Sequence, residues 1–321
     1  MDKNQSKGPI VPDTGVAAMS VEQTQGRFAA DEARTEVQGG NAFNRFFRRI
    51  PLHLVLIFVI LIWLVPTVGL LVSSFRPASL ISRTGWWTAF EDPSQFSLDL
   101  YQQALTQQGM GQSFVNSLFI SIPATIMPLM IAAFAAYTFA WMGFPGRNLL
   151  FILIIGLLVV PLQMTFVPVL QMYNRLGLTG TFPGIWLAHA AYGLPFAVYL
   201  LRNFIGGLPR DLFESAFLDG ATHFDIFFRI VLPLSIPAIA SLVIFQFMWV
   251  WNDLLVSLIF LGGYLAVAPM TMVIGQQVSS LGANWQVLTA SAFISMVVPL
   301  FVFFGLQRYF VRGILAGSVK G

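Results

Sequence analysis

The chain has 321 residues, of which 56% are hydrophobic and 10% are charged, and its mean hydropathy is +0.75. Soluble domains carry about 25% charged residues, so this composition excludes a soluble globular protein and indicates a membrane protein. Cysteine is absent, which excludes disulfides, thiolate metal sites and a cysteine nucleophile. The net charge of +3 is small, and the positions of the charges are more informative than their sum.

Residues 1–49 differ in composition from the rest of the chain. They are rich in Gln, Gly, Thr and charged residues and show no apolar periodicity. Such a segment does not bury enough apolar surface to offset the entropy lost on ordering. It also lacks the apolar core of a cleavable signal sequence. We therefore expect a mobile polar tail over 1–49, followed by a membrane domain over 50–321.

Six apolar stretches follow the tail, each near the roughly 20 residues that an α-helix needs to cross a bilayer. None shows the strict alternation of a membrane β-strand, so we predict helices. Several contain proline, which membrane helices tolerate where neighbouring groups bind the freed carbonyl oxygens. The chain is therefore predicted to be an all-α integral membrane protein with six transmembrane helices. The predicted spans are 52–73, 114–142, 149–172, 183–205, 234–261 and 289–311.

With six spans, both chain ends lie on the same side of the membrane as the loops at 143–148 and 206–233. That side carries fourteen of the seventeen basic residues, and the opposite side carries Arg76, Arg83 and Arg175. Because Lys and Arg accumulate in cytoplasmic segments, we predict that both termini are cytoplasmic. The fourteen are Lys3, Lys7, Arg27, Arg34, Arg45, Arg48, Arg49, Arg147, Arg202, Arg210, Arg229, Arg308, Arg312 and Lys320.

The predicted topology leaves three connections on the outer side and a short tail inside. The outer connections are a periplasmic loop over 74–113, a turn at 174–182 and a second periplasmic loop over 262–288. The cytoplasmic tail over 312–321 consists mostly of small residues, so we expect it to be flexible.

The cytoplasmic loop over 206–233 has the most specific pattern in the chain. We expect Asp211 to cap a first helix, with Glu214 at the third position of a capping box. Gly220 then permits a turn that a residue with a Cβ would resist. A second short helix is predicted from about Thr222 to Ile230, separated from the next span by Pro233. The pattern predicts a compact knob that stands out of the membrane, and an ordinary interfacial re-entry loop is the alternative.

The knob sequence resembles the EAA loop of ABC importer permeases. The matching pattern is Glu214, a small residue, Ala216, three residues, Gly220, nine residues, Ile230, one residue, Leu232 and Pro233. The family usually has Ala where this chain has Ser215, and both are small. Further stretches are similar to carbohydrate importer permeases, above all to the smaller, six-span subunit of maltose and α-glucoside systems. They are NSLFISIPAT (116–125), YNRLGLTGT (173–181), LPFAVYLLRNF (194–204), WVWNDLLVSL (249–258) and RYFVRGILAGSVKG (308–321).

The resemblance implies a bacterial inner-membrane subunit that imports a sugar, an α-glucoside or another oligosaccharide. It implies four kinds of partner: a second, different permease, two ATPase subunits that bind ATP and Mg, a sugar-binding protein, and the lipid bilayer. The knob would then be the coupling helix seated on an ATPase subunit. By the same resemblance, 262–288 reaches towards the binding protein, with a plain connector as the alternative, and 312–321 inserts between the ATPases. The implied coupling residues are Glu214, Ser215, Ala216, Asp219, Gly220, Ala221, Asp225, Leu232 and Pro233.

The chain carries no phosphate-binding loop of its own. Its only lysines are Lys3, Lys7 and Lys320, and none lies in a GxxxxGK[ST] pattern. ATP-driven transport would therefore need separate ATPase chains, and we expect no cofactor and no catalysis in this one.

Asp253 is the only acidic residue inside a predicted span. A charge at mid-bilayer costs about 2.5–3.5 kcal/mol on insertion scales, so Asp253 should face protein or water. Two interpretations stay open: a polar contact between helices, or part of a sugar path with its neighbours. A lone His189, with no Cys and no neighbouring carboxylate in sequence, is a poor metal ligand, so no metal site is predicted. The candidate path residues are Tyr192, Gln246, Trp249, Asn252 and Asp253.

Two rival functions remain at this point. An ion-coupled secondary transporter would use Asp253 as its coupling acid, but it predicts inverted repeats and several midplane charges, and no repeat is visible. A membrane receptor or scaffold would use the knob as a docking site without transport.

Overall fold

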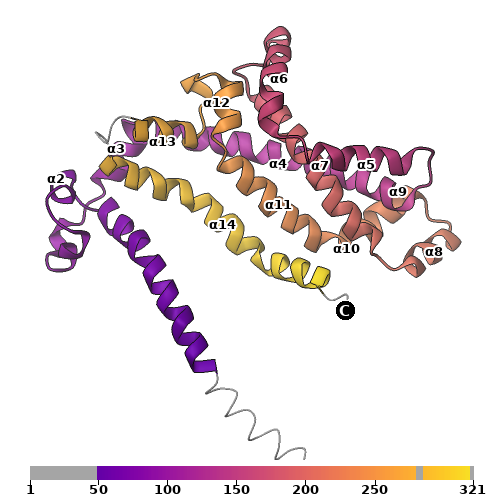
Figure 1. Cartoon of the computed structure of the whole chain (residues 1–321), viewed down its shortest axis with the longest axis horizontal. Helices are drawn as coiled ribbons and strands as arrows, with labels where there is room; N and C mark the ends of the chain where they lie inside the picture. The colour runs from indigo at the N-terminus through magenta and orange to yellow at the C-terminus, as the bar shows by residue number, and fades with distance from the viewer. Residues whose placement is uncertain (1–48, 280–284, 319–321) are drawn as a thin grey trace, which may run out of the picture. The chain divides into compact units, whose positions relative to one another are not determined.

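The computed structural model describes residues 49–279 and 285–318, with side chains described over 49–278 and 285–308 (Figure 1). The expected tail over 1–49 lies outside the described residues except for Arg49. All regular structure in these ranges is helical. The chain divides between Val68 and Gly69 into two units, which are considered separately.

The described part of the first unit belongs to one long helix. This helix runs from Arg49 to Ser74 and has 26 residues, which is long and apolar enough to cross a membrane. The predicted span over 52–73 lies within it.

The second unit is built on four long helices: α4 (Met110–Trp141), α7 (Phe182–Gly206), α11 (Ile236–Trp251) and α14 (Trp285–Ser318). The faces of α4 and α7 that meet are rich in small residues at helical spacing. On α4 these include Ala124, Ala132 and Ala136, and on α7 Ala188 and Ala197, all buried. Small side chains let two backbones approach closely, which is how membrane helices associate.

The stretch predicted as one span over 149–172 is not a single helix. It forms α5 (Arg147–Leu157) and α6 (Leu162–Leu176), which are bent by 98° at the break. Pro161 stands at the start of α6, and a proline has no N–H to continue a preceding helix. The predicted span is therefore a bent helix pair, and hydropathy alone does not indicate the size of such a bend.

The stretch predicted over 234–261 is also interrupted. It is preceded by α9 (His223–Ile226), a π-helical turn η3 (Phe227–Val231) and α10 (Leu232–Leu234), and α10 and α11 are bent by 71° at Ser235. Pro233 therefore lies inside α10, and the separation that it was expected to provide falls at Ser235. After α11 the chain breaks again, and α12 runs from Leu255 to Leu261.

Both long outer loops contain helices. The loop over 74–113 forms α2 (Ala78–Ile81), η1 (Trp86–Phe90), η2 (Pro93–Gln95) and α3 (Asp99–Thr106). They fold around Arg76, which is buried and donates hydrogen bonds to Gln95, Gly85 O, Thr84 and Thr88. In the loop over 262–288 the chain forms η4 (Leu265–Val267) and α13 (Met270–Ser279).

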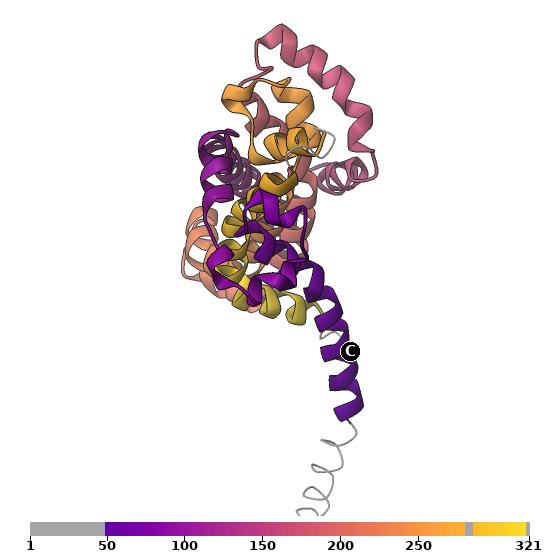
Figure 2. The ribbon, with the colours of Figure 1, turned by 90° about the vertical axis from the view of Figure 1, so that its left-hand side faces the viewer.

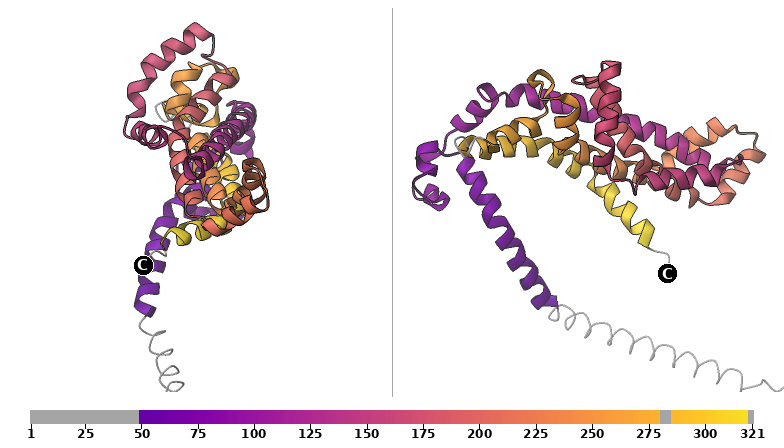
Figure 3. Two further views of the ribbon diagram at one scale, coloured as in Figure 1. Left: turned by 90° about the vertical axis from the view of Figure 1, so that its right-hand side faces the viewer. Right: turned by 45° about the horizontal axis from the view of Figure 1, so that its top comes forward.

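Within the second unit, the predicted outer and inner loops lie at opposite ends. Figures 1 and 2 show α3 and α13 together at one end, and the left panel of Figure 3 looks from the other, where α8 (Arg210–Leu218) and α9 lie.

Over the described residues, four helices qualify as membrane spans, or six if each bent pair counts as one. The sixth predicted span, 289–311, continues as helix to Ser318, so the expected flexible tail is helical that far.

Candidate functional site

The knob over 206–233 forms the two helices that the sequence predicted, with a different cap. Pro209 occupies the N-cap position of α8, which has no side-chain cap, so Asp211 lies in the first helical turn. The prediction of Asp211 as the cap was wrong because α8 starts earlier, directly after Pro209. The capping box of this region is instead on α9, where Thr222 and Asp225 bind each other's backbone N–H groups.

Gly220 makes the turn between α8 and α9. Its φ is +81°, a left-handed conformation that glycine adopts without steric cost. A Cβ added at this position would meet no atom within 4 Å, so the requirement comes from the backbone and not from crowding. The turn is closed by two hydrogen bonds, from Gly220 N to Phe217 O and from Ala221 N to Ala216 O, both 3.0 Å long.

The first helix of the knob is fixed to the bundle by one aromatic pair. Phe213 is 1% exposed, and its ring stacks on Trp141 at the end of α4, with centroids 3.6 Å apart. The indole Nε1–H of Trp141 donates to Ile205 O on α7 at 3.0 Å. This chain of contacts joins α8 to the ends of both α4 and α7.

The second helix of the knob has its own attachment to α4. The hydroxyl of Tyr137 lies 2.9 Å from His223 Nδ1, and Phe227 stacks on Phe134 with ring centroids 4.5 Å apart. Ile226 and Val231 are fully buried. Because both knob helices pack on the same end of α4, a force applied to the knob is transmitted directly to the bundle.

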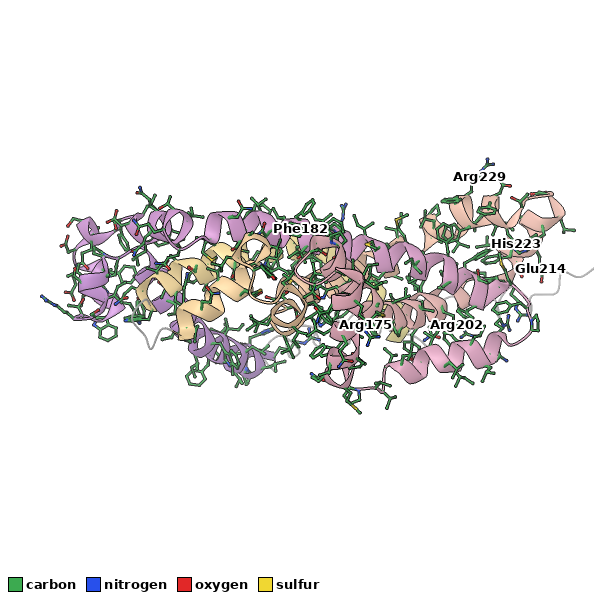
Figure 4. The ribbon with its side chains drawn as sticks, turned by 90° about the horizontal axis from the view of Figure 1, so that it is seen from above. Arg175, Phe182, Arg202, Glu214, His223 and Arg229 are labelled. Atoms are coloured by element: carbon green, nitrogen blue, oxygen red, sulfur yellow. The ribbon has the colours of Figure 1, made fainter. Side chains whose placement is uncertain are left out.

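The exposed surface of the knob carries acidic and large apolar side chains. Glu214, Ser215 and Asp219 are exposed, and Glu214 has no hydrogen-bond or ion-pair partner among the described residues. Leu218 is 89% exposed and Phe224 is 73% exposed. Figure 4 shows Glu214, His223 and Arg229 at this end of the unit, well separated from Arg175 and Phe182.

A shallow hollow of about 310 Å³ lies between the Gly220 turn and the second knob helix. Its lining includes Asp219, Gly220 and Ala221 from the turn and Asp225 and Arg229 from the second helix. Asp225 and Arg229 form an ion pair at 3.6 Å. The hydrogen bonds from Thr222 hold the pKa of Asp225 below its usual value, so this carboxylate is charged at neutral pH.

The remaining coupling residues predicted from sequence lie closer to the bundle. Ala216 and Ala221 are half-buried against it, as is Leu232, whereas Pro233 is exposed. The structure thus brings the predicted coupling residues into one helical knob. Sequence reasoning missed Phe213, Leu218 and Phe224, although large apolar residues flanking Gly220 in a connecting loop are a readable signal.

The five candidate path residues have different environments. Gln246 is buried and donates to Ala124 O at 3.2 Å and to His189 O at 3.4 Å, so it joins α11 to α4 and α7. Tyr192 pairs its hydroxyl with Thr165 on α6 at 2.9 Å. Trp249 and Asn252 are exposed. These two offer the most surface to a solute in this conformation, and Tyr192 and Asp253 are half-buried.

Asp253 lies in the break between α11 and α12. Its carboxylate accepts hydrogen bonds from Val256 N, Ser257 N and Ser257 Oγ, at 3.1, 2.9 and 3.0 Å, and so caps α12. His189 Nε2 lies 3.7 Å from Asp253 Oδ2. The expectation that His189 has no neighbouring carboxylate was therefore wrong in three dimensions, although no cluster of three metal-ligating side chains occurs in the described residues.

Comparisons with known proteins identify a family and several relatives. Residues 129–316 match the family model described as "Binding-protein-dependent transport system inner membrane component". The chain is 58% identical over 283 residues to the osmoprotective compounds uptake permease protein GgtD of Synechocystis sp., covering 87% of this chain and 95% of that protein. It is 56% identical over 234 residues to the alpha-glucoside transport system permease protein AglG of Rhizobium meliloti, covering 71% of this chain and 62% of that protein.

A more distant relative and one solved structure extend the comparison. The arabinooligosaccharides transport system permease protein AraQ of Halalkalibacterium halodurans is 33% identical, with 82% of this chain and 94% of that protein covered. A chain of a bacterial ABC transporter involved in the import of alginate shares the fold, with a TM-score of 0.67 at 20% identity, over 83% of this chain and 97% of that chain.

Proposed function

The chain belongs to the family of binding-protein-dependent transport system inner membrane components, and on that basis we propose that it is the membrane-spanning permease subunit of an ABC importer for a sugar. The observation that carries the proposal is the knob, a rigid helical pair whose exposed face is acidic and apolar. Its sequence is the EAA pattern around Glu214 and Gly220, and its position is the end of α4 and α7.

In this proposal the chain crosses the bacterial inner membrane six times, with both termini in the cytoplasm. The bent pair α5–α6 then counts as one span, and α11 with α12 forms the fifth span, directly after the cytoplasmic knob. The orientation rests on the distribution of basic residues, because fourteen of seventeen fall on the side that carries the knob. The periplasmic loops are then those over 74–113 and 262–288.

The knob is proposed to dock on one of two separate ATPase subunits, which bind ATP and Mg. Leu218 and Phe224 supply apolar anchors, and Glu214 faces a basic residue of the ATPase. Closure of the ATPase dimer would then pull the knob, and the contacts of Phe213 and His223 pass that movement to α4 and α7. The two sides of the path open alternately by rigid-body motion of packed helices, and this chain carries out no covalent chemistry.

The remaining proposed partners are a second, different permease and a sugar-binding protein on the outer side. The outer loop over 262–288 is tied to α4 by Asn116, whose Nδ2 donates to Ala266 O and Ala268 O at 3.0 Å. Met270 N also donates to Ser117 Oγ at 2.9 Å. A binding protein that docks on this loop would therefore act on the same helix that carries the knob at its other end.

The proposed cargo is an α-glucoside or another oligosaccharide, because the relative AglG is an alpha-glucoside transport system permease protein. Of the path residues, Trp249 and Asn252 would contact it, since a tryptophan face packs on a sugar ring and an amide bonds its hydroxyl groups. The other three candidates would position the helices that line the path without lining it themselves; they are Tyr192, Gln246 and Asp253. The ligand that the cognate binding protein binds would identify the cargo. If that ligand were an osmoprotective compound, it would replace the α-glucoside in this proposal.

Reconstitution tests the function directly. The complete complex in proteoliposomes should accumulate labelled sugar only with ATP inside, binding protein outside and both ATPase subunits present. Uptake that continued without the ATPase subunits and collapsed with the ion gradient would contradict the proposal and favour a secondary transporter. ATPase association without any uptake would favour a docking scaffold.

A further inference from the structure

His189 lies in the middle of α7 and is completely buried, with a side-chain exposure of 0%. Neither of its ring nitrogens has a hydrogen-bond partner among the described residues. Its ring packs edge-on against Trp249, with centroids 5.2 Å apart, and its backbone oxygen accepts the bond from Gln246. The surroundings of His189 are therefore fixed, but its polar atoms are not satisfied.

The nearest charged group is Asp253, in the break between α11 and α12. The distance from His189 Nε2 to Asp253 Oδ2 is 3.7 Å, about 0.5 Å beyond the usual limit of an N–H···O hydrogen bond. Asp253 is itself 8% exposed, so the pair is shielded from water. A small displacement of α7 along or towards this break would complete the bond.

The acceptor sites of Asp253 restrict how that bond can form. A carboxylate oxygen has two lone pairs, and Oδ2 already accepts from Ser257 N and from Ser257 Oγ. His189 Nε2 approaches Oδ2, so a bond to that oxygen displaces the Ser257 hydroxyl, which can turn to the backbone oxygen four residues earlier, as serines in helices do. The Ser257 hydroxyl is small and has an alternative acceptor, so the exchange costs little free energy.

A buried polar group without a partner shifts a conformational equilibrium by roughly 5- to 150-fold against the state that contains it. Such a cost is recovered when another state of the same protein supplies the partner. The two helices concerned are attached to opposite ends of the unit. Ile205 of α7 contacts the knob anchor Trp141, whereas Thr271 Oγ1 of α13 bonds Asp253 O at 2.6 Å.

We propose that His189 and Asp253 form a state-dependent hydrogen bond, in which His189 replaces the Ser257 hydroxyl on Asp253 when the transporter changes conformation. His189 is then a positioning residue for the helix break that carries Trp249 and Asn252. The inference rests on the proposed function, because it needs two conformations that alternate during transport.

The mechanism predicts opposite effects for two substitutions. His189→Leu removes the donor and disfavours the bonded state, whereas Ser257→Ala removes the competitor and favours it. The apparent affinity of the complex for sugar-loaded binding protein depends on that equilibrium. It should therefore move in opposite directions in the two variants, by roughly 5-fold or more each. His189→Gln keeps an N–H donor and should restore a value near that of the unsubstituted complex.

The experiment uses the complete complex in nanodiscs and measures binding-protein-stimulated ATP hydrolysis per assembled complex, with KM and kcat separated. Opposite shifts in KM, with rescue by His189→Gln, support the state-dependent bond. A shift in the same direction for both variants, or no shift, overturns it, because a purely structural role lowers assembly in both. If the unsubstituted complex shows neither stimulation nor uptake, the proposed function itself fails and the inference falls with it.

Discussion

Gly220 joins the knob helices at φ +81° with open space around its missing Cβ, so substitutions there isolate the cost of the backbone conformation. A left-handed conformation costs an L-residue about 1–2 kcal/mol, least for Asn and most for β-branched residues. Replacing Gly220 with Asn, Ala or Val should therefore weaken ATPase binding and sugar uptake increasingly in that order. Gly220→Val should reduce both by roughly 5- to 30-fold relative to the unsubstituted chain.

The control for this series is Gly206→Ala at the end of α7. Gly206 is helical, and an added Cβ would meet only Ala140 at an ordinary 3.9 Å. This variant should bind and transport normally. Equal losses in Gly206→Ala and Gly220→Val, measured by ATPase co-purification, would contradict the role given to the turn.

Leu218 and Phe224 are large apolar side chains that project from the knob. Anchors that fill a partner's pocket typically contribute about 2 kcal/mol or more to binding, so alanine at either position should weaken ATPase association by about 30-fold or more. Phe301 of α14 is 76% exposed and is a matched control outside the knob. If Phe301→Ala weakened association as much as Leu218→Ala, the loss would reflect general instability.

Glu214 is exposed and has no partner within the described residues, so its substitution should leave the isolated permease unchanged. In the complex, Glu214→Gln should slow ATPase association and reduce its dependence on salt, and Glu214→Arg should do more, because charges at an interface act mainly on the association rate. Association kinetics at two ionic strengths check this. If Glu214→Gln associated with the ATPase at the same rate and with the same salt dependence as the unsubstituted chain, Glu214 would not lie in the interface.

At the scale of the element, α8 carries two phenylalanines with different roles. Phe213 is buried against Trp141, whereas Phe217, one turn later, is half in solvent. Phe213→Ala should leave a cavity that costs about 3–5 kcal/mol and free the knob from α4. We expect faster proteolysis within 208–222 and fewer sugar molecules moved per ATP.

Phe217→Ala on the same helix is the comparison for this prediction. It removes a similar side chain without opening the core. If protease cleaved 208–222 no faster in Phe213→Ala than in Phe217→Ala, the stacked pair of Phe213 and Trp141 would not anchor the knob.

The knob was predictable because its signals are local. Gly220 marks the turn, and the small residues and acids around it fix the pattern. The break after Leu157 was not predictable from hydropathy, because the apolar run continues through it and the free energy of transfer does not depend on backbone direction. The break after Trp251 falls at Asn252 and Asp253, polar residues that the sequence marked, but their polarity did not predict that the helix ends there. The position of Asp253 at a helix start, and its approach to His189, depend on the packing of α7 against α11, which no local pattern reports.

At the scale of the whole molecule, the segment over 266–270 and the knob contact the same helix, α4, near opposite ends. Asn116 and Ser117 hold the outer loop near the start of α4, and Tyr137 and Trp141 hold the knob near its end. A continuous helix is a stiff connection, so this arrangement provides a direct route between the outer and inner partners. From the charge asymmetry we propose that the knob end is cytoplasmic.

The docking of the knob on an ATPase subunit is the central claim, and the absence of native cysteine makes it directly measurable. A single cysteine introduced by Leu218→Cys would be cross-linked with a short thiol-to-amine reagent in the assembled complex. The account predicts a product with the ATPase subunit, accessible only from the cytoplasmic face and changed in yield by ATP. A product with the binding protein, or labelling of this cysteine from the periplasmic side, would contradict both the orientation and the coupling role.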